Sequence, residues 1–129
     1  MVIKKFKTTD DNEIINWWKD WGLKIPDQEC LPKKGYVIIN NNIKVAAGYL
    51  YYTNAKIAYV DFVISNIKYR EKNRNTLITM LIDHMVNKAL KKGCKFVWAT
   101  TANSNIVDKV KKLNYKVLDK KHNIIYKYS

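Results

Sequence analysis

The stretch IAYVDFVISNIKYREKNRNTLITMLIDHMVNKALKKG, residues 57–93, decides how the chain folds. Its first part, Ile57 to Ile64, is an apolar and β-rich run interrupted only by Asp61, a pattern typical of a strand covered on both faces. From Arg74 the period changes to that of a helix with one wide apolar stripe, and Gly93 follows as a C-terminal cap. The stripe consists of Leu77, Ile78, Leu81, Ile82, Met85, Val86 and Ala89.

Between the predicted strand and the predicted helix lies a cationic loop, KYREKNRN, residues 68–75. Its four bases are Lys68, Arg70, Lys72 and Arg74. They stand beside the first N–H groups of the helix, which have no partner within the helix and carry partial positive charge. The loop therefore predicts an anion-binding site, and a solvated loop that binds no ligand is the alternative.

The rest of the chain predicts short strands and helices in alternation. Asp10 and Glu13 have the spacing of a capping box, and the helix that follows carries Trp17, Trp18 and Trp21 on one stripe. These rings favour a core position, although Trp18 or Trp21 could line an acceptor pocket. A further helix is expected to begin at Asn103 or Ser104, with Val110 on its inner face. Further strands are expected at Val2–Lys7, Gly35–Ile39, Ile43–Tyr52, Lys95–Thr101, Tyr115–Leu118 and Ile124–Tyr128, with turns at Asn40–Asn42 and Lys120–Asn123.

The resulting order is β, α, β, β, β, α, β, α, β, β, which predicts a mixed α/β fold. A three-stranded meander that leads into a β-α-β unit gives a mostly antiparallel sheet with helices on both faces. The 129 residues are expected to form a single domain, 1–129. The chain has no apolar run near the roughly 18 residues that a membrane span needs and no apolar segment typical of a secretory signal. Cys30 and Cys94 are interpreted as reduced thiols, which favours a cytoplasmic location, and no metal site is expected.

The net charge of +13 lies almost wholly in the second half of the chain. Residues 1–65 contribute +2 and residues 66–129 contribute +11. Only Arg70 and Arg74 are arginines, whereas base-edge and bidentate phosphate recognition favours arginine. The pattern favours a solvated lysine surface over a nucleic-acid partner.

The order of elements, with its cationic strand-to-helix loop, resembles the GNAT superfamily of N-acetyltransferases along essentially the whole chain. In that family a loop of the form R/Q-x-x-G-x-G/A binds the pyrophosphate of acetyl-CoA, and residues 70–75 match it with Asn73 and Asn75 at the glycine positions. The family's later Asn matches Asn103, its Gly-Phe pair matches Asn114-Tyr115, and its proton-donating Tyr falls at Val110. Small phage-encoded GNAT-like proteins are similar, with a Trp-rich N-terminal helix and a Ser-Asn pair here at Ser65-Asn66.

The resemblance implies that acetyl-CoA or CoA is the cofactor, held by main-chain and side-chain groups of the central strand, the loop and the later Asn. Asp61 is the candidate base, because burial would raise its pKa, and Tyr51 is a candidate for acceptor binding or proton relay. A salt bridge for Asp61 and ordinary sheet packing for Tyr51 are the alternatives. The implied cofactor-binding residues are Val63, Ile64, Ser65, Arg70, Glu71, Lys72, Asn73, Arg74, Asn75 and Asn103.

Two functions are carried forward from the sequence. The first is an acetyl-CoA-dependent N-acetyltransferase that acts on an amine of a small molecule or a protein. The second is a non-catalytic GNAT-fold protein of phage or mobile-element origin that contacts a host protein or nucleic acid through its basic C-terminal half. The Asn-for-Gly changes at residues 73 and 75 and the missing hydroxyl at Val110 motivate the second. A monomer or a homodimer is compatible with both.

Overall fold

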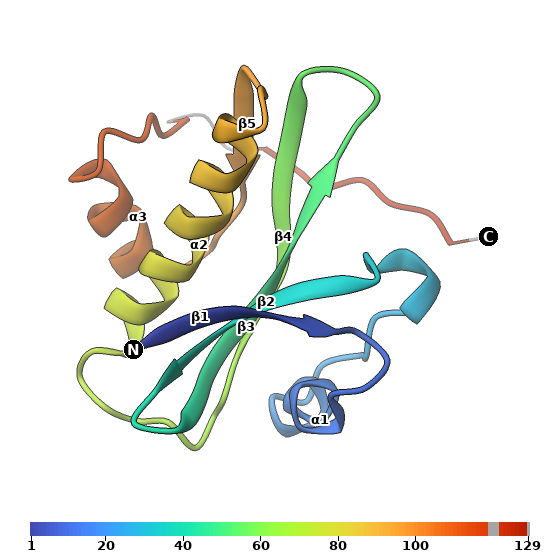
Figure 1. The fold of residues 1–129 in the computed structure, drawn as a ribbon, viewed down its shortest axis with the longest axis vertical. Coiled ribbons are helices and arrows are strands. Elements are labelled where there is room, and N and C mark those ends of the chain that lie inside the picture. The colour runs from blue at the N-terminus through green and yellow to red at the C-terminus, as the bar shows by residue number, and fades with distance from the viewer. Residues whose placement is uncertain (119–121, 129) are drawn as a thin grey trace.

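The structure, a computed structural model, describes residues 1–118 and 122–128 (Figure 1). The strands form one five-stranded sheet in the order β1-β2-β3-β4-β5. Neighbouring strands are antiparallel except β4 and β5, which are parallel. The mixed, mostly antiparallel sheet predicted from the sequence is confirmed. In chain order the elements are β1 (Val2–Lys7), α1 (Asn12–Asp20), the 3-10 helix η1 (Gln28–Cys30), β2 (Lys34–Asn40), β3 (Ile43–Tyr52), β4 (Ile57–Ser65), α2 (Arg74–Lys91), β5 (Phe96–Ala99) and α3 (Ser104–Lys111).

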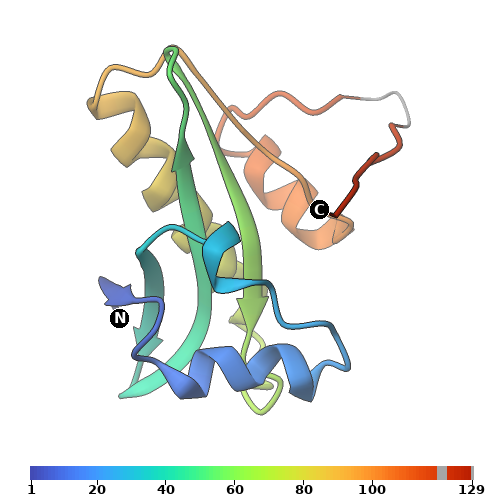
Figure 2. The ribbon, with the colours of Figure 1, turned by 90° about the vertical axis from the view of Figure 1, so that its right-hand side faces the viewer.

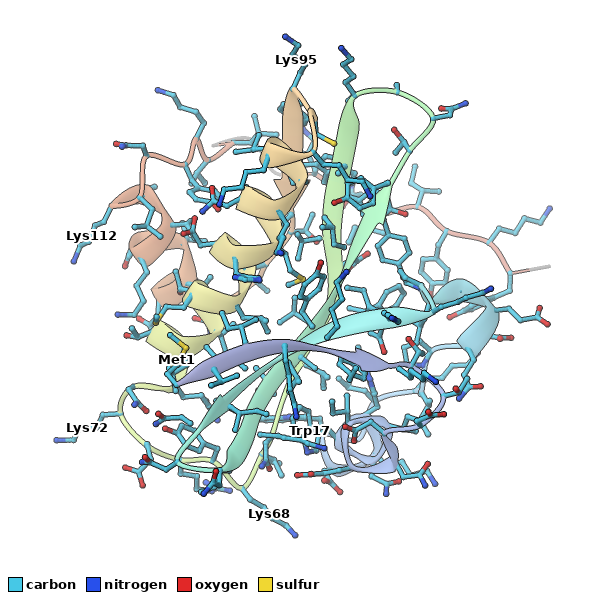
Figure 3. The ribbon with its side chains drawn as sticks, viewed as in Figure 1. Met1, Trp17, Lys68, Lys72, Lys95 and Lys112 are labelled. Atoms are coloured by element: carbon cyan, nitrogen blue, oxygen red, sulfur yellow. The ribbon has the colours of Figure 1, made fainter. Side chains whose placement is uncertain are left out.

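Helices cover both faces of the sheet, as predicted. On one face α1 packs Ile14 and Trp17 against a small apolar cluster with Val37, Ala47 and Ile64. Figure 2 shows α1 crossing the lower ends of the long strands, and Figure 3 shows Trp17 between helix and sheet. On the other face α2 buries its predicted stripe in the main core, to which α3 adds Ile106.

The turn and cap residues explain where two elements begin. Asn41 and Asn42 have φ values of 50° and 64°, so the β2–β3 turn uses the left-handed conformation that Asn tolerates, as predicted. The predicted cap Asp10 is wrong by one residue, because the Asp11 carboxylate accepts the Ile14 N–H at 3.1 Å. Asp11 also forms an ion pair with Lys44 of β3 at 2.6 Å, a contact that local spacing could not reveal.

The strands β4 and β5 are partly exposed, although β4 was predicted to be covered on both faces. In β4, Ile57 is 41% exposed and Asp61 is also exposed, so the strand is not covered on both faces. In β5, which spans four residues of the predicted Lys95–Thr101, Phe96 is 58% and Trp98 is 45% exposed. The helix layer explains the exposure of Asp61, since α1 packs against Ile64 and its C-cap residue hydrogen-bonds Ser65 at the end of β4.

The C-terminal hairpin expected from Tyr115–Leu118 and Ile124–Tyr128 is not observed, since neither described segment is a strand. Residues 119–121, most of the predicted turn, lie outside the described residues. Figure 2 shows the C-terminal segment standing away from the long strands, and Ile125 is 94% exposed. The apolar alternation that suggested strands therefore has no sheet neighbour to bury it.

Two leucines of α2 provide a matched test of the main core. Leu81 is fully buried, whereas Leu90 on the same helix is 45% exposed. We expect Leu81→Ala to lower the free energy of unfolding by about 2–5 kcal/mol through lost burial and a residual cavity. We expect Leu90→Ala to change it by about 0.5 kcal/mol or less. Urea denaturation followed by circular dichroism measures both, and equal losses would contradict this packing.

Candidate functional site

The pairing between β4 and β5 stops in the middle of β4. The parallel register ends at Val60, opposite Ala99, although β4 continues to Ser65 and stays paired with β3. From Asp61 onward, the side of β4 that faces β5 has no strand partner in residues 1–118 and 122–128. Main-chain N–H and C=O groups on a free strand side can hydrogen-bond an extended ligand.

A bulge lies at the start of this free stretch of β4. The register with β3 shifts between Ala47 and Tyr49, and Phe62 has a φ of 50°. This left-handed value is rare for a bulky residue and costs about 1–3 kcal/mol. The Asp61 carboxylate accepts the Phe62 N–H at 2.7 Å, which gives that donor a partner within the bulge. Bulges and strained residues occur often beside functional sites, because they redirect the chain.

The loop after β4, residues 66–73, is called the elbow below. Its first residue, Asn66, is buried, and its side-chain amide donates to the Lys44 carbonyl of β3 at 3.0 Å. The Asn66 Oδ1 atom accepts the Lys68 N–H at 3.0 Å, and the Asn66 N–H donates to the Val45 carbonyl at 2.8 Å. Asn66 therefore fixes the elbow to β3 at the point where β4 ends.

Tyr69 fixes the other end of the elbow. Its buried hydroxyl donates to Asn73 Oδ1 at 2.7 Å and accepts from Asn40 Nδ2 at 3.2 Å. Asn73 occupies the N-cap position of α2, yet its side chain makes no cap hydrogen bond because it is engaged by Tyr69.

Among the three described α-helices, α1 has both a side-chain cap and an acidic residue in its first turn, and α3 has a cap but no acidic residue there. Only α2 has neither. The Arg74 N–H donates to the Glu71 carbonyl at 3.2 Å. The Asn75 and Thr76 N–H groups, by contrast, have no hydrogen-bond partner among residues 1–118 and 122–128 and stay available for an anion.

The two asparagines at the family's glycine positions fit the chain without strain. Asn73 has a φ of −85°, and Asn75 lies inside α2. Asn75 Oδ1 accepts from Asn103 Nδ2 at 3.4 Å, while Asn103 Oδ1 accepts main-chain N–H groups that cap α3. The structure thus brings Asn75 and Asn103 together. Asn114, by contrast, does adopt a left-handed φ of 68°.

The exposed bases of the elbow have no carboxylate partner among the described residues. Lys68, Arg70 and Lys72 are exposed, as is Glu71, and Figure 3 shows Lys68 and Lys72 pointing outward from the loop. Their positive charge is therefore not neutralised by an ion pair beside the start of α2. Side chains of this length can turn toward an anion without moving the main chain.

The end of α1 closes against the same region. Trp21 Nε1 donates to the Ser65 carbonyl at 2.7 Å, and the Arg74 guanidinium lies 6.0 Å from the Trp21 ring centroid. Trp21 is 39% exposed, so it is not a core residue as Trp17 is. Of the other predicted residues on β4, Val63 faces Gly48 and the α2 side, whereas Ile64 is buried on the α1 side. Only their main-chain groups could meet a ligand at the free side of β4.

Five aromatic rings form a continuous row on the α1 face of the sheet, beside the place where β4 and β5 part. The rings of Tyr51 and Tyr59 are stacked at 4.7 Å, and Trp98 stacks on Tyr59 at 5.3 Å. Phe62 lies 6.4 Å from Tyr51 and 6.1 Å from Trp18. We call these five residues the aromatic row. Sequence reasoning did not select Tyr59, Phe62 or Trp98, although the period of two along β4 places Tyr59 on the same face as Asp61.

The two candidate catalytic residues lie at this row. The Tyr51 hydroxyl donates to the Cys30 carbonyl at 2.8 Å, which connects η1 to β3. Burial, and then the neighbouring Tyr59 and Asp61, raise the pKa of Tyr51, so its hydroxyl stays protonated at neutral pH. Asp61 is exposed, so the expectation that burial would tune this carboxylate is wrong. Asp61 is paired opposite Tyr49 and shares the α1 face with Tyr59 through the alternation of the strand.

Other features of the described residues do not compete with this site. A hollow of about 390 Å³ lies between β1 and the outer side of α2, and one of about 440 Å³ lies near Gly93. Neither contains a residue of the elbow or of the aromatic row. Within residues 1–118 and 122–128 no helix is long and apolar enough to cross a membrane, and no group of three or more His, Cys, Asp or Glu side chains could hold a metal ion. Cys30 and Cys94 are not disulfide-bonded.

Comparison with solved structures identifies the fold. No family model and no curated relative matches the chain. An aminoglycoside acetyltransferase from an uncultured soil metagenomic sample, in complex with trehalose, is 15% identical and has a TM-score of 0.67 over 99% of this chain and 96% of that one. A GNAT-family acetyltransferase from Streptococcus pneumoniae TIGR4 is 13% identical, with a TM-score of 0.66 over 99% and 98%. An aminoglycoside N-acetyltransferase in complex with CoA is 12% identical, with a TM-score of 0.61 over 99% of each chain. The chain has the fold of the GNAT acetyltransferases.

The hydroxyl of Tyr69 provides a test of how the elbow is held. Tyr69→Phe removes the donor to Asn73 and the acceptor for Asn40, so we expect it to lower the free energy of unfolding by about 0.5–1.5 kcal/mol. Tyr126→Phe is the control, because Tyr126 is 76% exposed, and we expect almost no change. Urea denaturation measures both, and an unchanged Tyr69→Phe variant would contradict this account of the elbow.

Proposed function

We propose that the chain is an N-acetyltransferase that transfers an acetyl group from acetyl-CoA to an amine. The observation that carries this proposal is the free side of β4, which leads directly to the uncapped and cationic start of α2. An extended ligand with an anionic end could bind along the free side of β4 and place its anionic end at the start of α2. The fold shared with acetyltransferases supports the proposal, including one solved in complex with CoA.

We call the free side of β4 beyond Val60 the opening, and the residues around it match the chemistry of coenzyme A. Its diphosphate would meet the N–H groups of the first turn of α2 together with Arg70, Lys72 and Arg74. Its amide-containing arm would hydrogen-bond main-chain groups of residues 61–65 on β4 other than the Phe62 N–H and the Ser65 carbonyl, which Asp61 and Trp21 engage. Acetyl-CoA supplies an acetyl group that is activated as a thioester. The tethered side chains of Asn73 and Asn75 leave this binding mode open, because Tyr69 and Asn103 already engage them.

The acceptor reaches the site as an ammonium ion and must lose one proton before its nitrogen can form the new C–N bond. Asp61 is placed to attract the ammonium group and to receive this proton, which then passes to water. Overall, an ammonium ion and acetyl-CoA give an acetamide, CoA and one proton. Because Asp61 is exposed, its main contribution is to orient the acceptor at the opening.

The departing thiol needs no dedicated acid in this scheme. Val110 carries no ionisable group, but a thiol with a pKa of about 8.5 leaves readily as the thiolate. Tyr51 stays protonated and already donates to Cys30, so it relays a proton only when that hydrogen bond opens. Tyr115 is engaged in the same way, since its hydroxyl donates to Asp83 on α2 at 2.9 Å.

Isothermal titration with CoA and acetyl-CoA tests the proposal. We expect binding to the unmodified chain and an affinity about tenfold lower for Arg70→Ala, because a charge-assisted contact to phosphate is lost. The matched control is Lys95→Ala, which also removes one exposed positive charge. Figure 3 shows Lys95 at the opposite end of the molecule from the elbow, so this variant should bind CoA normally.

Two results would contradict the proposal. The first is the absence of heat with both ligands at millimolar concentration, which would favour a non-catalytic binding protein with this fold. The second is equal loss of affinity in Arg70→Ala and Lys95→Ala, which would indicate general charge attraction by a chain of net charge +13.

A further inference from the structure

The aromatic row is an unusual surface for a chain with so many lysines. Trp98 is 45% exposed, and Tyr51, Tyr59, Phe62 and Trp18 are half-buried, so the row is neither core nor fully solvated. The stacked rings cover one another's faces, which leaves their edges and the outer part of Trp98 for a ligand. An aromatic ligand can pack its face against such edges or extend the stack on Trp98.

A single carboxylate lies within this row without a cation. Asp61 is exposed on β4, two residues beyond Tyr59, and the β3–β4 register places Tyr51 opposite Tyr59. Lys44 makes the only ion pairs among the described residues, with Asp11 and Glu13. In a chain with 24 bases and 11 acids, an exposed carboxylate that has no ion pair in the described part of the chain and stands next along the strand to stacked rings can accept a cation from outside.

The distance between the Tyr59 and Asp61 side chains along β4 limits the length of a ligand that contacts both. Asp61 follows Tyr59 by two residues, so the two side chains point to the same face about 7 Å apart along the strand. Trp98 stands beside Tyr59 on β5, in the parallel register Tyr59 to Trp98. The aromatic ring of a ligand bound at Trp98 and Tyr59 could therefore be joined by a short aliphatic chain to an ammonium group at the Asp61 carboxylate. The same carboxylate borders the opening between β4 and β5.

We propose that the acceptor is a primary amine carried on an aromatic ring by a short aliphatic arm. The ring packs against Trp98 and Tyr59, and the ammonium group pairs with Asp61 at the mouth of the opening. This inference rests on the proposed acetyl transfer for its biological meaning, although the binding itself does not require the coenzyme. It adds Trp98 and Tyr59 as specificity-determining residues, because they select the flat body of the acceptor.

The probes are 2-phenylethylamine, its uncharged analogue 2-phenylethanol and the ring-free cation n-propylamine, each titrated without coenzyme. The readout is the indole N–H signals in nuclear magnetic resonance spectra, with Trp98 identified through the Trp98→Phe variant. We expect 2-phenylethylamine to shift the Trp98 signal and to bind at least about threefold more tightly than either analogue. The signal of Trp17, which is 2% exposed beneath α1, should not move.

Two variants separate the contributions of charge and ring. Asp61→Asn should lower the affinity for 2-phenylethylamine about threefold or more and leave the affinity for 2-phenylethanol unchanged. Trp98→Ala should lower the affinities for 2-phenylethylamine and for 2-phenylethanol about three- to tenfold. Asp108→Asn on α3 is the matched control, because it removes an exposed carboxylate away from the row, and it should bind all probes normally.

Equal affinity for 2-phenylethylamine and 2-phenylethanol would overturn the inference, as would an Asp61→Asn variant that binds the amine normally. If CoA binds while the amine does not, the acceptor class is wrong and the proposed acetyl transfer still stands. If the amine binds while CoA does not, the amine site stands and the proposed transfer falls. The two titrations therefore report on separate claims.

Discussion

The arrangement of the candidate site depends on the point along β4 where β5 stops being its second neighbouring strand. β5 is only four residues long and is paired with β4 as far as Val60, so the rest of β4 has β3 alone for a partner. Main-chain groups that lack a partner must be solvated or bound by a ligand. The β4 bulge with its left-handed Phe62 lies beside this point, directly after Asp61. The opening is thus a consequence of one short strand.

The elbow joins this opening to the start of α2, where no side chain caps the helix. Asn66 and Tyr69 are polar, yet both are buried and hydrogen-bonded, so they fix the loop as a core residue would. Tyr69 also occupies the Asn73 side chain that would otherwise cap α2. The Asn75 and Thr76 N–H groups therefore stay free beside bases that form no ion pair in the described part of the chain. Asn73 and Asn75 are compatible with this arrangement, because hydrogen bonds inside the chain hold both side-chain amides.

The sequence predicted those parts that local pattern determines. The stripe on α2, the Asn41–Asn42 turn, the mixed sheet and the cationic elbow all follow from spacing between near neighbours. The exposure of Asp61 did not follow, because it depends on how far α1 extends across the sheet. Tyr59 and Trp98 were missed for a related reason, since they meet only through the β4–β5 register. The C-terminal hairpin was predicted from apolar alternation alone, which cannot show whether a neighbouring strand accepts the segment.

The central claim is that acetyl-CoA occupies the free side of β4 and the start of α2 together. Hydrogen–deuterium exchange with and without acetyl-CoA tests it most directly, because exchange reports protection residue by residue. The account predicts slower exchange in residues 61–65 and in the first turn of α2, with no change in β1 at the far edge of the sheet. Unchanged exchange in both segments at saturating acetyl-CoA, or protection confined to β1, would contradict it.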